Sequence, residues 1–188
     1  MKKIFAVAAL ALFAACNSNN EPAKVDSMKS PSDSTTAQTM RDINSPYQIM
    51  YSSKFEIADP KYAEAVLGLW KDWDNGDLMN SKNSFADTLN FYFADGTMIH
   101  ASRDSALAIA QAARNKIATS VSRVDAVIAV KSTDKDENWA LIWGSEKDTD
   151  KKGNMDSTQL QETWRFNKDG KLDQVFQYRM AHKPPKKK

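Results

Sequence analysis

The chain has 188 residues, of which 41% are hydrophobic and 27% charged, with 26 Lys and Arg against 24 Asp and Glu. Between Phe55 and Ala181 there are 16 basic and 20 acidic residues, so this part has a net charge of −4. An acidic balance argues against nucleic-acid binding, which depends on neutralising phosphates. One cysteine and two histidines exclude an intrachain disulfide and argue against a zinc site, so we expect no metal and no cofactor.

The N-terminal residues predict a bacterial lipoprotein signal. Lys2 and Lys3 precede an apolar run over residues 4–12, and Ala14-Ala15 stand directly before Cys16. This pattern is typical of a secretory signal, and the run is too short for a permanent membrane helix. The site resembles a lipobox, although Phe13 replaces the usual Leu. We therefore expect residues 1–15 to be removed and Cys16 to be acylated, which would anchor the protein in the cell envelope. The expected place is the outer membrane, facing the periplasm or the exterior.

Composition divides the rest of the chain into a tether and one domain. Residues 16–54 are rich in Ser, Thr, Asn, Pro and Lys, so we expect a disordered polar tether. Residues 55–181 are expected to form one compact domain, and residues 182–188 a basic tail. Within the tether a small apolar island could dock on the domain: Tyr47, Ile49, Met50 and Tyr51.

The first part of the domain predicts three helices. Asp59-Pro60 and Asn75-Gly76 are typical start and end signals for the first. A second is predicted over residues 81–89, and Ser102 or Asp104 begins the third. Residues 91–93 and 97–100 predict short strands on either side of an Asp-Gly turn. Apolar residues at helical spacing support the first helix (Tyr62, Val66, Leu69, Trp70, Trp73) and the third (Leu107, Ala110, Ala113, Ile117).

The second part of the domain predicts four long strands, because apolar residues there alternate with polar ones. Short polar turns near residues 134–137, 149–154 and 167–170 separate the strands. The alternating residues are Val124, Ala126, Ile128 and Val130; Trp139, Leu141 and Trp143; Leu160, Glu162, Trp164 and Phe166; and Leu172, Gln174, Phe176, Tyr178 and Met180. The expected fold is α+β, an antiparallel meander with three helices on one face.

This order of elements resembles the nuclear transport factor 2-like superfamily, and within it the SnoaL-like group. The resemblance rests on a Trp-bearing first helix, the segment FYFADGTMIH, a capped helix and strands ending in WRFNKDGKLDQVFQYRM, and it covers residues 60–180. It implies a cone-like curved antiparallel sheet packed against three N-terminal helices, with a pocket between them. The same fold carries isomerases, cyclases, dehydratases, hydrolases and non-catalytic proteins, so fold alone does not decide function.

The resemblance also implies a carboxylate that acts as general base in the enzymes of the group. Ala101 and Met180 stand at the two positions where such carboxylates are expected, which argues against those mechanisms. The alternative candidates are His100 and Glu162, as an acid–base pair of an isomerase, lyase or hydrolase. Histidine is a side chain suited to proton transfer at physiological pH, and Glu162 would point into the pocket if its strand face is the concave one. A partly exposed, structural histidine is the competing interpretation.

Aromatic residues are the other signal, because an aromatic pocket with few polar groups suits a flat or apolar ligand. Most of them are expected to form the core. The expected function is therefore binding of a small apolar or aromatic molecule, without established catalysis, by a membrane-anchored protein. A dimerisation or partner-docking domain, including a homodimer, is the third alternative. The candidate ligand-binding residues are Trp70, Trp73, Phe91, Trp143, Trp164 and Tyr178.

Overall fold

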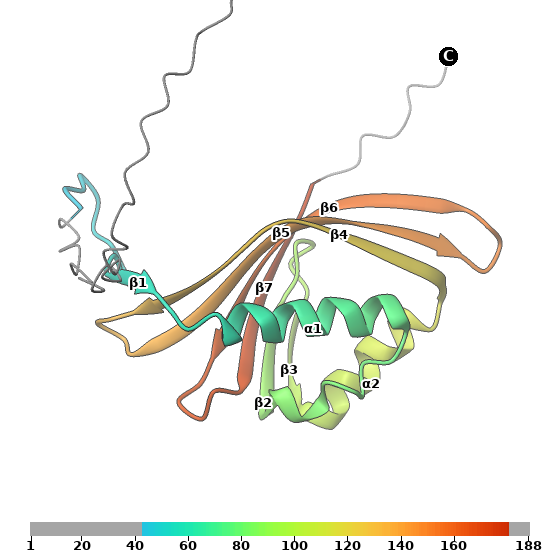
Figure 1. The fold of residues 1–188 in the computed structure, drawn as a ribbon, viewed down its shortest axis with the longest axis horizontal. Coiled ribbons are helices and arrows are strands. Elements are labelled where there is room, and N and C mark those ends of the chain that lie inside the picture. Colours follow the sequence, from blue (N-terminus) through green and yellow to red (C-terminus); the bar gives the residue numbers. More distant parts are fainter. Residues whose placement is uncertain (1–42, 181–188) are drawn as a thin grey trace, which may run out of the picture. The chain divides into compact units, whose positions relative to one another are not determined.

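The computed structural model describes residues 43–180 of the chain (Figure 1). The predictions for the signal peptide, for Cys16 and for the tail at residues 182–188 lie outside the described residues. Within the described range, no helix is long and apolar enough to cross a membrane.

The described residues form one seven-stranded sheet, two α-helices and a short 3₁₀ helix. The strand order is β1-β4-β5-β6-β7-β2-β3, so the four long strands form the predicted meander. All neighbouring strands are antiparallel except β2 and β7, which are parallel. In chain order the elements are β1 (Phe55–Ile57), α1 (Lys61–Asn75), η1 (Lys82–Ser84), β2 (Phe85–Tyr92), β3 (Met98–Ser102), α2 (Arg103–Arg114), β4 (Ile117–Ser132), β5 (Glu137–Asp150), β6 (Met155–Phe166) and β7 (Leu172–Arg179).

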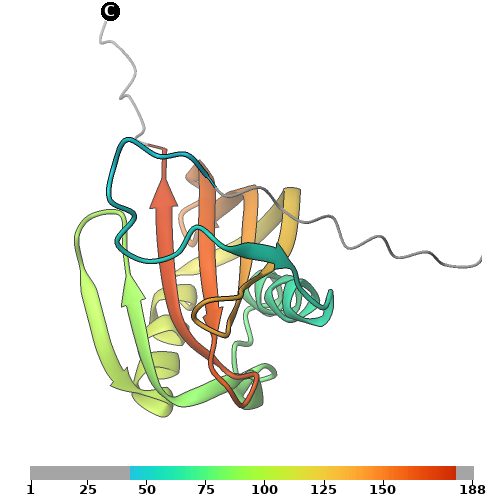
Figure 2. The same ribbon diagram turned by 90° about the vertical axis from the view of Figure 1, so that its left-hand side faces the viewer.

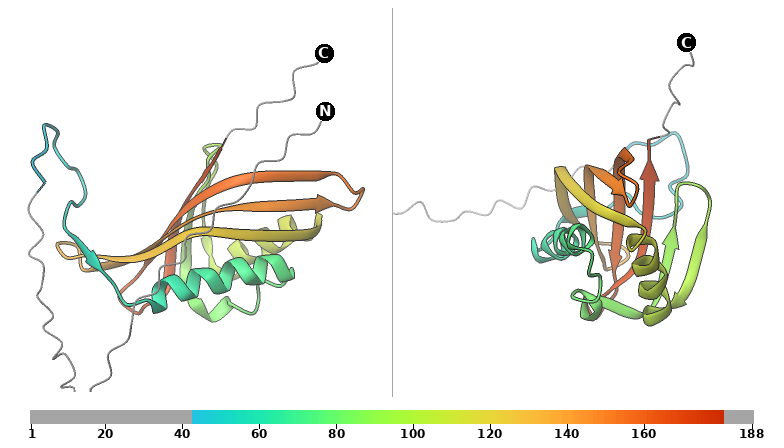
Figure 3. Two further views of the ribbon diagram at one scale, coloured as in Figure 1. Left: turned by 45° about the horizontal axis from the view of Figure 1, so that its top comes forward. Right: turned by 90° about the vertical axis from the view of Figure 1, so that its right-hand side faces the viewer.

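Both α-helices lie on the same side of the curved sheet (Figures 1 and 3). We call the sheet face toward α1 and α2 the inner face and the opposite one the outer face. Along β6, every second residue from Leu160 to Phe166 is buried on the inner face, as the alternation predicts. The hydrophobic core lies between this face and the helices; its largest members include Trp70, Phe85, Leu107, Ile142, Trp164 and Phe166.

Local signals set the limits of the helices as predicted. Asp59 accepts a hydrogen bond from the Lys61 backbone N–H at 2.9 Å at the start of α1. Gly76 ends α1 with a φ of 81°, a left-handed conformation that glycine adopts without strain. Ser102, rather than Asp104, caps α2 and accepts a hydrogen bond from the Ser105 backbone N–H.

The prediction of a helix over residues 81–89 is wrong, so α1 and α2 are the only α-helices in residues 43–180. One 3₁₀ turn at Lys82–Ser84 leads directly into β2. Phe85 and Leu89 are four residues apart, a spacing that suits one face of a helix and one face of a strand equally well. Pairing of β2 with both β7 and β3 decides in favour of the strand.

A bulge in β4 interrupts the predicted alternation of that strand. Val124 pairs with Gly144 on the inner face, whereas Ala126 pairs with Trp143 on the outer face, because Asp125 is the additional residue between them. Beyond the bulge, Ile128 and Val130 follow Ala126 on the outer face.

The segment before α1 also belongs structurally to the domain. Phe55–Ile57 forms β1, an edge strand that pairs with β4 and that the sequence did not predict. In Figure 2, the segment that contains β1 crosses in front of the other strands. Of the apolar island, Tyr51 packs against Trp139, with ring centroids 6.1 Å apart, whereas Tyr47 and Met50 are each 81% exposed.

Candidate functional site

The inner face and the two helices enclose an aromatic pocket, which we call the inner pocket. It consists of two adjoining cavities of about 150 Å³ and about 330 Å³. The smaller cavity extends to Trp70, Glu162 and Trp164, and the larger one to Asp148 and Arg179. Both are lined by Trp73, Phe91, Ala110, Glu146, Leu160 and Gln177.

Glu162 is buried at the sheet side of this pocket, with 6% of its surface exposed. One carboxylate oxygen accepts hydrogen bonds from the indole N–H groups of Trp70 at 2.7 Å and Trp164 at 2.9 Å. The other oxygen accepts one from the Gln177 amide at 2.8 Å. Burial of a carboxylate is costly unless hydrogen bonds compensate for lost water, and these three donors provide that compensation. Glu162 thus ties α1, through Trp70, to strands β6 and β7.

A second carboxylate, Glu146 on β5, lies in the same pocket. Its side chain accepts hydrogen bonds from the Trp73 indole N–H and from the Ser120 hydroxyl, the latter at 3.1 Å. Burial, and then the nearby charge of Asp148, raise the pKa of Glu146 to about 7. One oxygen of Asp148 is buried and has no hydrogen-bond partner among residues 43–180. Glu146 can therefore take up or release a proton near neutral pH inside an aromatic cavity.

Sequence reasoning missed Glu146 and Asp148. A signal existed, because both continue the even-numbered alternation of Ala140, Ile142 and Gly144 along β5. The apolar residues of that alternation end at Gly144, and the polar residues after it indicate an exposed end of the strand. Only the position of α1 over this end of β5 shows that the inner face is covered there, by Trp70 and Trp73.

The predicted acid–base pair of His100 and Glu162 is wrong, because the two side chains lie on opposite faces of the sheet. Ile99 lines the inner pocket and Ala101 packs on the core, so His100 between them points outward. Its Nδ1 is 2.7 Å from the Asn90 side-chain oxygen on the neighbouring strand β2. Glu162 is in the pocket, which decides between the two faces of the strand that the sequence left open.

The predicted aromatic ligand-binding residues divide between the two faces. Trp70, Trp73, Phe91 and Trp164 line the inner pocket. Trp143 and Tyr178 lie on the outer face and are 39% and 56% exposed, so they do not reach that pocket. Adjacent side chains of a strand point to opposite faces of the sheet. The residues next to Trp143 and Tyr178 point inward, so these two side chains point outward.

The two positions implied for a family carboxylate do not supply one. Ala101 packs against the core, and Met180 is 70% exposed at the end of β7. Within residues 43–180, no group of three or more potential ligand side chains is arranged to hold a metal ion. The polar groups that line the inner pocket are the carboxyl groups of Glu146, Asp148 and Glu162, the Gln177 amide, the Ser122 hydroxyl and the Arg179 guanidinium.

Comparison with known proteins yields similarity in structure rather than in sequence. No protein-family model matches the chain, and no curated protein matches it in sequence. A putative SnoaL-like polyketide cyclase from Shewanella denitrificans OS-217 is 12% identical, with 65% of this chain and 92% of that chain covered and a TM-score of 0.54. An LEH-like epoxide hydrolase from M. tuberculosis is 10% identical, with 63% and 77% covered and a TM-score of 0.52.

An NTF2-like protein of unknown function from Exiguobacterium sp. 255-15 is 12% identical, with 63% of this chain and 99% of that chain covered and a TM-score of 0.51. The mixed fold, with a curved and unclosed sheet covered by helices on one face, agrees with these similarities. The chain therefore has the nuclear transport factor 2-like fold, which is also the fold of SnoaL-like proteins.

Proposed function

We propose that the domain binds a small, mainly apolar molecule in the inner pocket, and that the carboxyl groups of Glu146 and Glu162 orient it. The observation that carries this proposal is that two carboxyl groups, the buried one of Glu162 and the partly buried one of Glu146, lie among tryptophans in one cavity. Pockets of small-molecule sites are mostly apolar and contain a few convergent polar groups, and the inner pocket has this composition.

The protonation of Glu146 determines which ligand groups fit. As a neutral acid, its carboxyl group offers one hydrogen-bond donor to a carbonyl or hydroxyl oxygen. When ionised, it accepts hydrogen bonds and attracts an amine. Since the pKa of Glu146 is about 7, both forms are populated near neutral pH. Glu162 receives three hydrogen bonds from protein groups, so its capacity for a ligand is smaller.

The direct test is to look for a molecule retained by the purified full-length protein, by native mass spectrometry. Ala110 on α2 lines both cavities, so Ala110→Trp is expected to fill the pocket and abolish retention. Ala112→Trp, at an exposed position of the same helix, is the matched control and should retain the molecule. Equal retention by both variants would contradict the proposal.

Glu146 gives a prediction about stability and pH. The raised pKa means that the folded protein holds this proton up to about pH 7, whereas the unfolded chain loses it near pH 4.5. The free energy of unfolding of the wild type is therefore expected to fall as pH rises through this window, and then to level off. Glu146→Gln does not titrate, so its stability relative to wild type should increase with pH in urea denaturation series.

Asp148→Asn provides the control for this prediction. It removes a charge that contributes to the raised pKa of Glu146. The pH range over which the free energy of unfolding falls should therefore end at a lower pH, although the fall should still be observed. Parallel stability profiles for wild type and Glu146→Gln would show that Glu146 has an ordinary pKa.

A proton-transfer enzyme is the second candidate function, and the position of Glu146 is the observation that favours it. A general base works best when its pKa lies near the operating pH, which burial and Asp148 provide here. This candidate is of the isomerase, lyase or hydrolase type. In the isomerase or lyase case it predicts that the retained molecule exchanges a hydrogen with heavy water in the presence of the wild type and not of Glu146→Gln. Equal exchange with both proteins would contradict it.

We further propose that the domain is anchored in the cell envelope through an acyl group on Cys16, for which the sequence pattern at residues 2–16 is the support. Cells grown with radiolabelled palmitate are expected to label the wild type and to lose the label in Cys16→Ser. The variant should also leave the membrane fraction, since acylation supplies the anchor. Ser18→Ala, two residues away, should behave like the wild type. Label in Cys16→Ser would disprove the anchor.

A further inference from the structure

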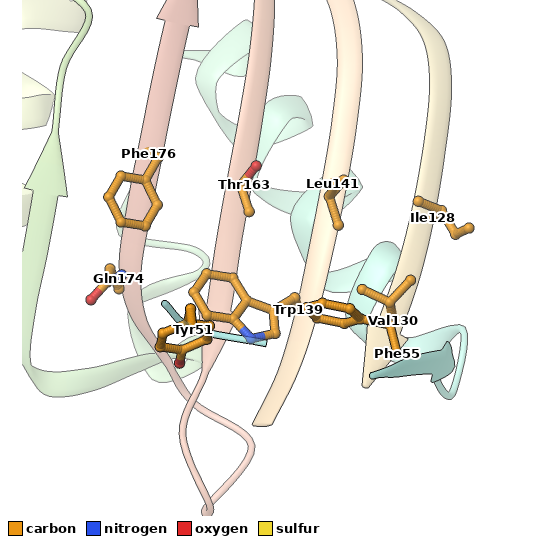
Figure 4. A pocket seen from close by; sticks show the side chains of 9 residues that line it. All are labelled: Tyr51, Phe55, Ile128, Val130, Trp139, Leu141, Thr163, Gln174 and Phe176. Atoms are coloured by element: carbon orange, nitrogen blue, oxygen red, sulfur yellow. The ribbon is translucent and has the colours of Figure 1, made fainter. Parts of the chain in front are cut away.

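The outer face carries a second pocket, which we call the outer pocket, with a volume of about 480 Å³ (Figure 4). It lies on the side of the sheet opposite the inner pocket, so one ligand cannot occupy both. Its volume is in the usual range of small-molecule sites. The walls are almost entirely apolar, and the main ones are Tyr51, Val130, Trp139, Leu141 and Phe176.

Hydrogen bonds hold the segment before β1 against one end of this pocket. The Tyr51 hydroxyl donates to the Glu137 carboxylate, and the Ser52 hydroxyl donates to Asp134. The Thr133 backbone N–H donates to the Lys54 carbonyl at 2.9 Å. Tyr51 therefore forms a wall of the pocket while 47% of its surface faces solvent.

Trp139 supplies a polar group that no residue in the range 43–180 satisfies. Its side chain lines the pocket and the residue is 7% exposed, yet its indole N–H is buried without a hydrogen-bond partner. Buried indole N–H groups normally have a partner, and an unsatisfied one costs about 1–3 kcal/mol. In Figure 4 the indole nitrogen lies at the Tyr51 end of the pocket. The Tyr51 ring stands edge-on to the indole, with an interplanar angle of 88°. A ligand can reach the indole N–H only when this ring moves outward, which breaks the hydrogen bond from the Tyr51 hydroxyl to Glu137.

We propose that the outer pocket is a second binding site, for a neutral apolar molecule that carries one carbonyl acceptor. The apolar part lies against Trp139, Leu141 and Phe176, and the carbonyl oxygen accepts the hydrogen bond from the Trp139 indole. A neutral ligand is favoured because none of the residues that line the pocket is charged. Arg165, over the Trp139 ring, makes two hydrogen bonds to Asp173 at 2.9 and 3.1 Å.

Binding can be followed with Prodan, a small neutral naphthalene ketone whose emission shifts to the blue in apolar surroundings. The Ala110→Trp protein serves as the background, so that the inner pocket is filled. In this background we expect saturable binding of one Prodan per chain. Thr163→Trp, placed between Leu141 and Phe176 by strand pairing, should weaken it at least about tenfold by filling the pocket. Gln174→Trp, at another lining position, should do the same.

Ser145→Trp is the matched control, because Ser145 is on the outer face of β5 and away from the pocket. It should leave the affinity unchanged, and circular dichroism checks that each variant is folded. No saturable binding, or equal binding by Thr163→Trp, Gln174→Trp and Ser145→Trp, would overturn the proposal. So would a dimer, seen by light scattering, that both pocket-filling variants dissociate, because a second copy of the chain would then cover this face.

Trp139→Phe tests the hydrogen bond itself. It keeps an aromatic ring and removes the N–H, so Prodan affinity should fall about 3–10-fold, the usual net value of one hydrogen bond. N-phenyl-1-naphthylamine, which has no carbonyl, should lose less affinity than Prodan in the same variant. Equal losses for the two probes would overturn the assignment of the Trp139 N–H as the donor.

Discussion

Gly144→Ala is expected to lower the free energy of unfolding by about 3 kcal/mol, the upper part of the usual range for overpacking. An added Cβ at this position would lie 2.3 Å from the Arg123 carbonyl oxygen and 2.9 Å from Trp70 Cζ3. The first contact is with the backbone of the neighbouring strand β4 and cannot move without disturbing the bulge at Asp125. The second displaces the indole that donates to Glu162. Urea denaturation followed by tryptophan fluorescence measures the change.

Gly68→Ala is the matched control for this substitution. Gly68 lies on the exposed side of α1, and no heavy atom would come within 4 Å of an added Cβ. Since glycine is unfavourable in a helix interior, this change should raise stability by about 0.5–1 kcal/mol. If the two variants are equally stable, the close approach of α1 to β5 at Gly144 does not exist in solution.

Glu162→Ala is expected to cost about 3 kcal/mol of unfolding free energy, because it leaves buried donors without an acceptor. The indole N–H groups of Trp70 and Trp164 and the Gln177 amide all donate to this carboxylate. Relief from burying the carboxylate offsets part of the loss, which is why the estimate is below the sum of three unsatisfied donors. Thermal and urea denaturation of the purified protein check the value.

Two variants control for side-chain loss in general. Glu162→Gln keeps the volume and one acceptor oxygen, so it should cost less than Glu162→Ala. Glu64→Ala, at an exposed position of α1, should change stability by less than about 0.5 kcal/mol. A Glu162→Ala protein as stable as Glu64→Ala would mean that the network around Glu162 does not hold α1 to the sheet.

The same network connects stability with the proposed binding. Trp70, Trp164 and Glu162 both line the inner pocket and join α1 to the sheet. A ligand that takes a hydrogen bond from this cluster competes with the fold for it. Ligand binding and the free energy of unfolding are therefore expected to change together in variants of these residues. In variants of Glu146, the two quantities are expected to differ in how they depend on pH.

Sequence alone determined those features that short-range chemistry controls. The Asp59-Pro60 and Gly76 signals limit α1, Ser102 or Asp104 marks the start of α2, and alternation over four segments predicts the meander. These depend on hydrogen bonds within a few residues or on the two-residue period of a strand. Both can be recognised without knowing which element packs on which.

Tertiary structure alone decided the features that depend on partners distant in the chain. Residues 85–89 became a strand because β7 and β3 offered hydrogen bonds on both sides. His100 separated from Glu162 because β3 presents it on the outer face, and Glu146 gained its raised pKa because α1 covers a polar strand end. The outer pocket formed where Tyr51 reached Trp139 across more than eighty residues of sequence. Burial is a property of what covers a residue, and that cover comes from elsewhere in the chain.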